Sequence, residues 1–263
     1  MKQPSYNHQS EQFAAILAEA GAEAQSILKE RNAGKRAKAE AEAQSILKER
    51  NSNLRTETDF LKKKWKRMFA DAFKVSLEIQ KPDDAIRALN MIIPPALADI
   101  PMAIVYTAVI FKNIGQEEEA VKWADKIMTL DPQNENDDVM LAKGRIFEKG
   151  IGRYAANAEK AISFYKSAAA KGNQDALCFI ADMYYEGEMM KQDYQMVLSI
   201  AKMAYEAKNA YGLFIYGRAY CEGKGQPKDS LIGKRLIYDA IGMRNTSYIG
   251  ATMAEIYKKK KNL

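Results

Sequence analysis

The sequence has one histidine and two cysteines among its 263 residues. His8 lies in a polar leader, so neither a His-based triad nor a histidine-ligated metal centre has a second member to work with. Cys178 and Cys221 make no disulfide framework and lack the spacing of metal ligands, which favours a reducing, cytoplasmic location. No pair of carboxylates stands out from ordinary helix-surface charge. These absences predict a protein that is not an enzyme and uses no metal or cofactor.

Long apolar runs are also absent. The most apolar stretch, MAIVYTAVIF at 102–111, is too short to span a bilayer. No transmembrane segment is therefore expected. The N-terminal stretch MKQPSYNHQSEQ contains no apolar core of a signal peptide. The 40 basic and 34 acidic side chains give a net charge of +6, which aids association with an acidic partner but does not by itself indicate nucleic acid. The abundance of Ala, Lys, Glu and Leu favours helical structure.

An internal repeat is the strongest positive signal. Three stretches share an aromatic residue followed three positions later by a glycine: FEKGIGRYAAN (147–157), YYEGEMMKQD (184–193) and YCEGKGQPKD (220–229). Their glycines, Gly150, Gly187 and Gly223, are spaced by 37 and 36 residues. A period of this size predicts a stacked array of helical units.

The residue types at the repeated positions predict how each unit is built. Gly144, Ala181 and Gly217 are small, so two helices can cross closely there, and an aromatic residue one turn later fills the space beyond. The repeated glycines suit left-handed helix C-caps. Asp193, Asp229 and Asn157 precede the next apolar-periodic segment, as N-caps do. The glycine-rich loop at 220–229 is therefore predicted to be a turn rather than a phosphate-binding loop.

These residues resemble the Sel1-like repeat, an α/α hairpin. The first unit, with KGRIFEKGIG followed by EKAISFYKSAAAKGN, matches most fully. The second unit loses the second loop glycine, and the third has Gly233, Leu236 and Ile237 in its second helix. The resemblance implies units at 137–173, 174–209 and 210–245 and a capping helix at 246–260.

Upstream, the segment at 102–135 resembles a tetratricopeptide repeat through Phe111, Gly115, Ala120 and Pro132. Residues 58–98 offer one more, degenerate helical hairpin. The expected fold class is all-α: a right-handed α/α superhelical solenoid of helical hairpins over 54–263, preceded by a helical N-terminal arm.

The arm, residues 1–53, contains the sequence AEAQSILKERN twice, at 22–32 and 41–51. Its step of 19 residues does not preserve a heptad register, so a long regular coiled coil is not expected. Two interpretations are open. The duplication gives a solvated, mobile helical arm, or the arm orders on a partner and serves docking or oligomerisation.

A basic cluster, KKKWKR, follows the arm and comprises Lys62, Lys63, Lys64, Lys66 and Arg67. An apolar stripe interleaves with it, so the basic side chains lie on the remaining helix face. That face is either simply solvated or contacts the phosphate groups of nucleic acid or anionic lipid. The terminal run of lysines lacks the interleaved aromatic residues of a stacking surface and is interpreted as a solubilising tail.

The first helices of the hairpins are expected to line a groove that binds an extended partner. The residues assigned to that groove are Val109, Lys112, Arg145, Glu148, Asp182, Tyr185, Tyr211, Phe214 and Arg218. Alternating charge with aromatic anchors suits a protein segment better than a nucleic-acid track. The resemblance to Sel1-like proteins likewise implies contacts between proteins. The sequence therefore predicts a non-catalytic adaptor, scaffold or chaperone, with a nucleic-acid-associated regulatory protein as the alternative.

Overall fold

The computed structural model describes residues 45, 48, 64, 67–79, 81–131, 133 and 136–263. The chain divides into two compact units, Met1–Lys64 and Trp65–Leu263, and nearly all of the described residues belong to the second. The predicted arm at 1–53 and its boundary lie almost entirely outside the described residues. The duplicated arm and its two interpretations therefore stay predictions.

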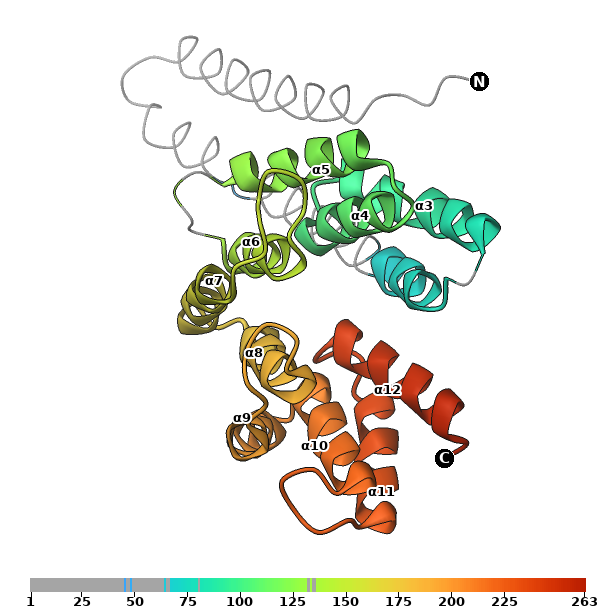
Figure 1. Ribbon diagram of the computed structural model, residues 1–263, viewed down its shortest axis with the longest axis vertical. Helices are drawn as coiled ribbons and strands as arrows, with labels where there is room; N and C mark the ends of the chain where they lie inside the picture. Colours follow the sequence, from blue (N-terminus) through green and yellow to red (C-terminus); the bar gives the residue numbers. More distant parts are fainter. Residues whose placement is uncertain are drawn as a thin grey trace. The chain divides into compact units, whose positions relative to one another are not determined.

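The larger compact unit, Trp65–Leu263, is built from helices arranged in antiparallel pairs (Figure 1). Residues 67–77 form its first described helix. The later helices are α3 (Pro82–Leu97), α4 (Pro101–Asn113), α5 (Glu117–Leu130), α6 (Asp137–Lys149), α7 (Ala158–Ala170), α8 (Gln174–Glu186), α9 (Tyr194–Glu206), α10 (Ala210–Glu222), α11 (Ser230–Gly242) and α12 (Tyr248–Lys261). Every regular element among the described residues is a helix. The predicted all-α solenoid of helical hairpins is confirmed.

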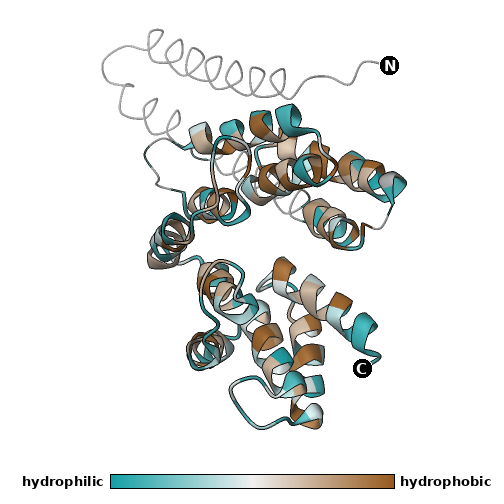
Figure 2. Ribbon diagram, in the orientation of Figure 1, coloured by the Kyte–Doolittle hydropathy of each residue, from teal (hydrophilic) through white to brown (hydrophobic). Residues whose placement is uncertain are grey.

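The hairpins α4–α5, α6–α7, α8–α9 and α10–α11 each pack helix against helix, and α12 packs on both helices of the last pair. One apolar core runs through the array. Helix α4 is apolar on nearly all sides and buries most of its residues, whereas the C-terminal end of α12 is hydrophilic (Figure 2). Helix α4 is therefore the most enclosed element of the first half.

The small residues at the repeated positions allow the close helix crossings that the sequence predicts. A Cβ atom on Gly144 would lie 2.5 Å from the ring of Tyr165 on α7. A Cβ atom on Gly217 would lie 3.0 Å from the backbone oxygen of Gly233 on α11. Any larger side chain at either position would push the two helices of its hairpin apart.

The turns follow the predicted capping pattern. Gly150, Gly187 and Gly223 end their helices with φ of 61°, 71° and 69°, in the left-handed region that suits glycine. The side chains of Asp193 and Asp229 accept hydrogen bonds from the first backbone N–H groups of α9 and α11. The loop at 220–229 is therefore a C-cap followed by an N-cap, which is a turn between helices.

A second set of caps links consecutive units and was not predicted. Asn209 accepts hydrogen bonds from the backbone N–H groups of Tyr211 and Gly212 at 2.8 and 3.0 Å. Its amide donates at 2.8 Å to Asp175 in the first turn of α8, and Ser247, the N-cap of α12, donates to the other oxygen of Asp175 at 2.9 Å. The amide of Asn173 likewise donates to Asp137 and Asp138 at 3.1 Å each, although its side chain accepts no hydrogen bond from the backbone of α8. These bonds fix the N-terminal ends of α8, α10 and α12 to their neighbours.

The Asn209→Ala substitution should lower the free energy of unfolding by about 2–3 kcal/mol, because it removes an N-cap and the hydrogen bond to the half-buried carboxylate of Asp175. The Asn209 residue has no exposed surface, so solvent cannot replace the lost bonds. Urea unfolding monitored by circular dichroism measures the change. The matched control is Asp229→Ala, an N-cap for which no contact to a preceding unit is seen, expected to cost about 1 kcal/mol. Equal losses in the two variants would contradict the linking role of Asn209.

Candidate functional site

Charged and hydroxyl side chains of successive units meet along the first helices of the hairpins. We call this set the polar ladder. It consists of Tyr106, Arg145, Glu148, Tyr165, Asp182, Tyr185, Glu186, Tyr211, Arg218, Glu222 and Tyr257. Each of its bonds described below joins neighbouring helices of the array or successive turns of one helix. These bonds link α6 with α4 and α7, and α8 with α10, and the guanidinium of Arg145 on α6 lies over the ring of Phe179 on α8 between the two groups.

Arg145 occupies the first step of the polar ladder. Its guanidinium pairs with Glu148 one turn later and lies over the rings of Tyr106 and Phe179, at 5.7 and 5.1 Å from their centroids. Only 14% of the side chain is exposed. The hydroxyl of Tyr165 donates to Glu148 at 2.5 Å. A buried charge pair requires this many partners to offset its desolvation.

The pKa of Glu148 reflects the same balance. Burial raises the pKa of this carboxyl, but Arg145, Lys149 and the hydrogen bond from Tyr165 together hold it below its usual value. Glu148 is therefore a carboxylate at neutral pH. Its charge serves to hold Arg145 in place rather than to transfer a proton.

Asp182 occupies the second step and is less well satisfied. Its Oδ2 atom accepts a hydrogen bond from the hydroxyl of Tyr211, but its buried Oδ1 atom has no hydrogen-bond partner among the described residues. Burial raises the pKa of Asp182 to about 6, although Tyr211, Arg218 and Arg145 oppose the rise. The Asp182 residue as a whole is half-buried, so the atom rather than the residue is cut off from solvent.

Arg218 occupies the third step and contacts one aromatic ring and two carboxylates. Its guanidinium lies 3.9 Å from the centroid of the Tyr185 ring. It donates to Glu186 at 2.7 Å and to Glu222 at 3.3 Å, and the hydroxyl of Tyr185 donates to Glu222 at 2.8 Å. The Arg218 and Glu186 side chains keep 18% and 47% of their surface exposed. This step is the most accessible part of the polar ladder.

The structure brings together Arg145, Glu148, Asp182, Tyr185 and Arg218, but it corrects the expected exposure of the aromatic residues. Tyr185, Tyr211 and Phe214 were expected to face an open groove, and they are only 2–3% exposed. Rings of neighbouring units cover them: Tyr211 packs edge-on against Phe179, and Phe214 packs against Tyr257. These rings pack in the core beneath the charged groups of the ladder. The expectation that they are exposed and anchor a partner is therefore wrong.

The side chains of Lys112 and Val109 contact other parts of the array rather than facing a groove. The ammonium of Lys112 donates to the carbonyl oxygens of Lys149 and Gly150, at 2.6 Å each, and so caps the C-terminus of α6. Val109 is partly buried against the core. Neither residue lies at a step of the polar ladder.

The sequence analysis did not single out Glu186 and Glu222, which pair with Arg218. A signal was present, because each of these glutamates directly precedes a repeated glycine, at a step of 36 residues. Tyr106 was also missed, since it lies in the upstream segment at 102–135, outside the three Sel1-like units from which the groove positions were chiefly assigned. Which side chains of two neighbouring units pair with each other can be predicted only when the alignment of one unit against the next is known.

The basic cluster is mostly outside the described residues. Lys62, Lys63 and Lys66 are not described, and Lys64 and Arg67 are exposed. The proposed contact with phosphate groups therefore stays a prediction.

The thiol of Cys178 is buried and that of Cys221 is half-buried. Burial raises the pKa of the Cys178 thiol well above its usual value and raises that of Cys221 to a smaller extent. The described residues include no group of three His, Cys, Asp or Glu side chains that could hold a metal ion. None of the helices in the described part of the chain is both long and apolar enough to cross a membrane.

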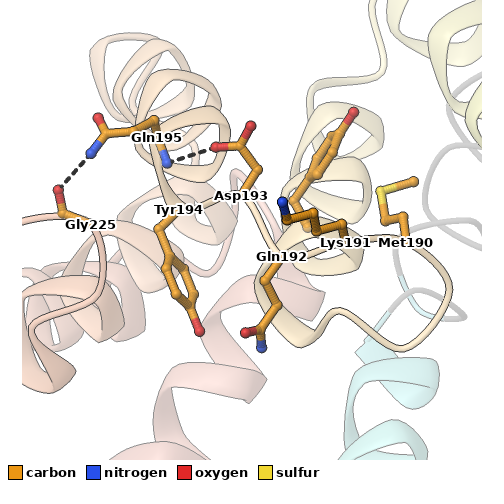
Figure 3. Close-up of a pocket in the computed structure, with 8 residues that line it drawn as sticks. Met190, Lys191, Gln192, Asp193, Tyr194, Gln195 and Gly225 are labelled. Carbon is orange, nitrogen blue, oxygen red and sulfur yellow. Dashed lines mark hydrogen bonds between the residues drawn. The ribbon is translucent and has the colours of Figure 1, made fainter.

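A hollow of about 620 Å³ lies beside the turn between α8 and α9, lined in part by Tyr184, Met190 and Tyr194 (Figure 3). The side-chain amide of Gln195 donates to the carbonyl oxygen of Gly225 at 3.1 Å, which ties the next turn to α9. The backbone N–H of Gln195 donates to Asp193 at 3.0 Å. Both of these hydrogen bonds stabilise turns of the array. The hollow therefore lies where the turns of two successive units meet.

Comparisons with known proteins bear on the repeats. No family model matches the chain. Over 102 residues the chain is 33% identical to an uncharacterized Sel1-like repeat-containing protein of Schizosaccharomyces pombe, a match that covers 38% of this chain and 15% of that protein. The predicted resemblance to Sel1-like repeats is confirmed, whereas the tetratricopeptide-like interpretation of 102–135 stays a prediction. The chain spans only a small part of this curated relative.

Two solved structures are similar to the chain. One is a Sel1 repeat protein from Oxalobacter formigenes, at 24% identity and a TM-score of 0.36, covering 66% of this chain and 48% of that chain. The other is a protective antigen of uropathogenic Escherichia coli strains that displays an SLR fold. Its identity is 18% and its TM-score 0.27, with 74% of this chain and 49% of that chain covered.

The Asp182→Asn substitution should stabilise the protein by about 2–3 kcal/mol at pH 7.5, by roughly half as much at pH 5, and by almost nothing below about pH 4. The folded-state pKa of about 6 exceeds the unfolded value of roughly 3.9, so the stability that protonated Asp182 provides is lost as pH rises from about 4 to about 6. Asparagine keeps an acceptor for Tyr211 and carries no charge. Urea unfolding of both proteins between about pH 3.5 and 8 tests this. A variant that is less stable than the parent by a constant amount at every pH would contradict the buried charge.

Proposed function

We propose that the chain is a non-catalytic adaptor, scaffold or chaperone, acting in the cytoplasm, and that a partner protein binds along the polar ladder. The observation that carries the proposal is the third step, where Arg218 is held flat over Tyr185 by two glutamates and still keeps exposed surface. A guanidinium fixed in this way loses little side-chain entropy when a partner carboxylate or backbone oxygen approaches.

The charge pattern favours a protein partner over nucleic acid. Glu186 and Glu222 flank Arg218, and Glu148 pairs with Arg145, so carboxylates accompany each arginine of the ladder. A phosphate backbone would meet these carboxylates with repulsion, whereas a protein surface carries both signs of charge. The resemblance to Sel1-like proteins supports the same partner class.

The repeated hairpins also support a binding role over a catalytic one. Glu148 has a lowered pKa and is committed to Arg145, and both thiols have raised pKa values. Apart from Asp182, whose Oδ1 atom has no partner among the described residues, these titratable groups of the ladder orient one another. A rigid array of this kind presents an extended surface to a partner.

The Glu186→Lys substitution should lower affinity for the partner about tenfold or more, because it removes an exposed carboxylate that holds the Arg218 guanidinium in place and sets a like charge beside it. Arg218→Glu should act in the same direction. The matched control is Lys122→Glu, a charge reversal on α5 at a side chain that is 66% exposed. Affinity capture from the native lysate at two salt concentrations, with and without nuclease, compares the four proteins after circular dichroism has verified their folding.

One protein retained by the parent and by Lys122→Glu through high salt and nuclease, and lost by both ladder variants, is the expected result. Equal retention by all four proteins would remove the polar ladder as the binding site. Retention of material that nuclease releases would favour the alternative, in which the basic cluster at 62–67 binds nucleic acid.

A further inference from the structure

Two ion pairs join the first described helix, 67–77, and the turn that follows it to α12. The ammonium of Lys74 lies 2.7 Å from Glu255, and the ammonium of Lys259 lies 3.0 Å from Glu78. The members of each pair are 181 residues apart in the sequence. Helix 67–77 and α12 lie beside one another in Figure 1. The array therefore returns on itself far enough for its two ends to touch.

Each of the two helices in this contact also packs firmly against its own neighbours in the array. Phe69 and Phe73 of the first helix pack on Tyr106 of α4, with ring centroids 5.9 and 4.6 Å apart. On the other side, Tyr257 of α12 packs edge-on against Phe214 of α10. Arg244, in the turn before α12, also pairs with Glu255 and orients it. Separating the ends thus requires the array to flex, while each end keeps its own aromatic packing.

The two ion pairs that join the ends are individually weak. The side chains of Lys74 and Glu255 are 45% and 21% exposed, and those of Lys259 and Glu78 are 75% and 33% exposed. Ion pairs this exposed contribute little stability and are screened by salt. Their part of the contact can therefore form and break reversibly.

We propose that Lys74, Glu78, Arg244, Glu255 and Lys259 form an electrostatic latch, which closes the two ends of the array around the polar ladder and opens to admit the partner. The part of this inference that concerns admission rests on the proposed function. The latch lies next to the ladder, because Glu255 and Tyr257 share α12 and the Tyr257 hydroxyl hydrogen-bonds Glu222. If the partner binds only the open form, its apparent affinity is reduced by the fraction of molecules that are open.

The latch is tested without any partner by measuring the distance between its two sides in the full chain. Spin labels are placed at Asp71→Cys and Lys260→Cys, both exposed positions, in a Cys221→Ser background in which Cys178 is buried. Double electron–electron resonance then gives the distance distribution. In 0.1 M salt we expect one narrow distribution, and in 1 M salt a broader one that is longer by roughly a helix diameter, about 10 Å.

A charge swap on the first helix should open the latch at low salt. The double variant Lys74→Glu with Glu78→Lys keeps the net charge but sets like charges against Glu255 and Lys259. The matched control swaps Glu119→Lys with Lys122→Glu, an ion pair within α5 that joins no two elements. We expect the longer distribution in the first variant at 0.1 M salt and the parent distribution in the control.

A distance distribution that is unchanged by salt and by the charge swap would overturn the latch, because something other than these charges would then hold the ends. The partner found by affinity capture gives the second readout, in which the swapped variant should bind several-fold to about tenfold more tightly than the parent. Unchanged affinity despite a longer distance would refute admission control. Absence of a captured partner would count against the proposed function alone, since the distance measurement does not depend on it.

Discussion

The close crossing of two helices at a small residue is the constraint on which the rest of the structure depends. At Gly144 and Gly217 the second helix of the hairpin lies so near that a Cβ atom would meet a ring carbon or a backbone oxygen. Because the same crossing recurs at each unit, successive units stack with one register. That register brings side chains 29 to 39 residues apart into contact along the first helices.

Burial of charge follows from this tight stacking and determines what the polar ladder can do. Arg145 and Glu148 are enclosed by aromatic rings and compensate one another, whereas Arg218 and Glu186 compensate one another and still reach solvent. The first step therefore serves mainly to fix the register of units. The third step combines a fixed geometry with accessibility, which is the combination that recognition of a partner requires.

The repeat period, the capping glycines and the N-caps could be predicted from the sequence, because each depends on contacts within one hairpin. The exposure of the ladder could not. Tyr211 lies on the face that helical spacing assigns to a groove, yet Phe179 of the preceding unit covers it. The linking role of Asn209 was equally hidden, although Asn173 lies 36 residues before it. Contacts between units depend on how units stack, and a single sequence does not give that geometry.

The most direct measurement of the central claim is amide hydrogen exchange of the full chain with and without its captured partner. If the polar ladder is the binding face, protection should increase in the C-terminal halves of α8 and α10, around Glu186 and Arg218, and change little in α5 and α9. Protection confined to α5, α9 or α11, the second helices of the hairpins, would contradict the account and assign binding to the opposite side of the array.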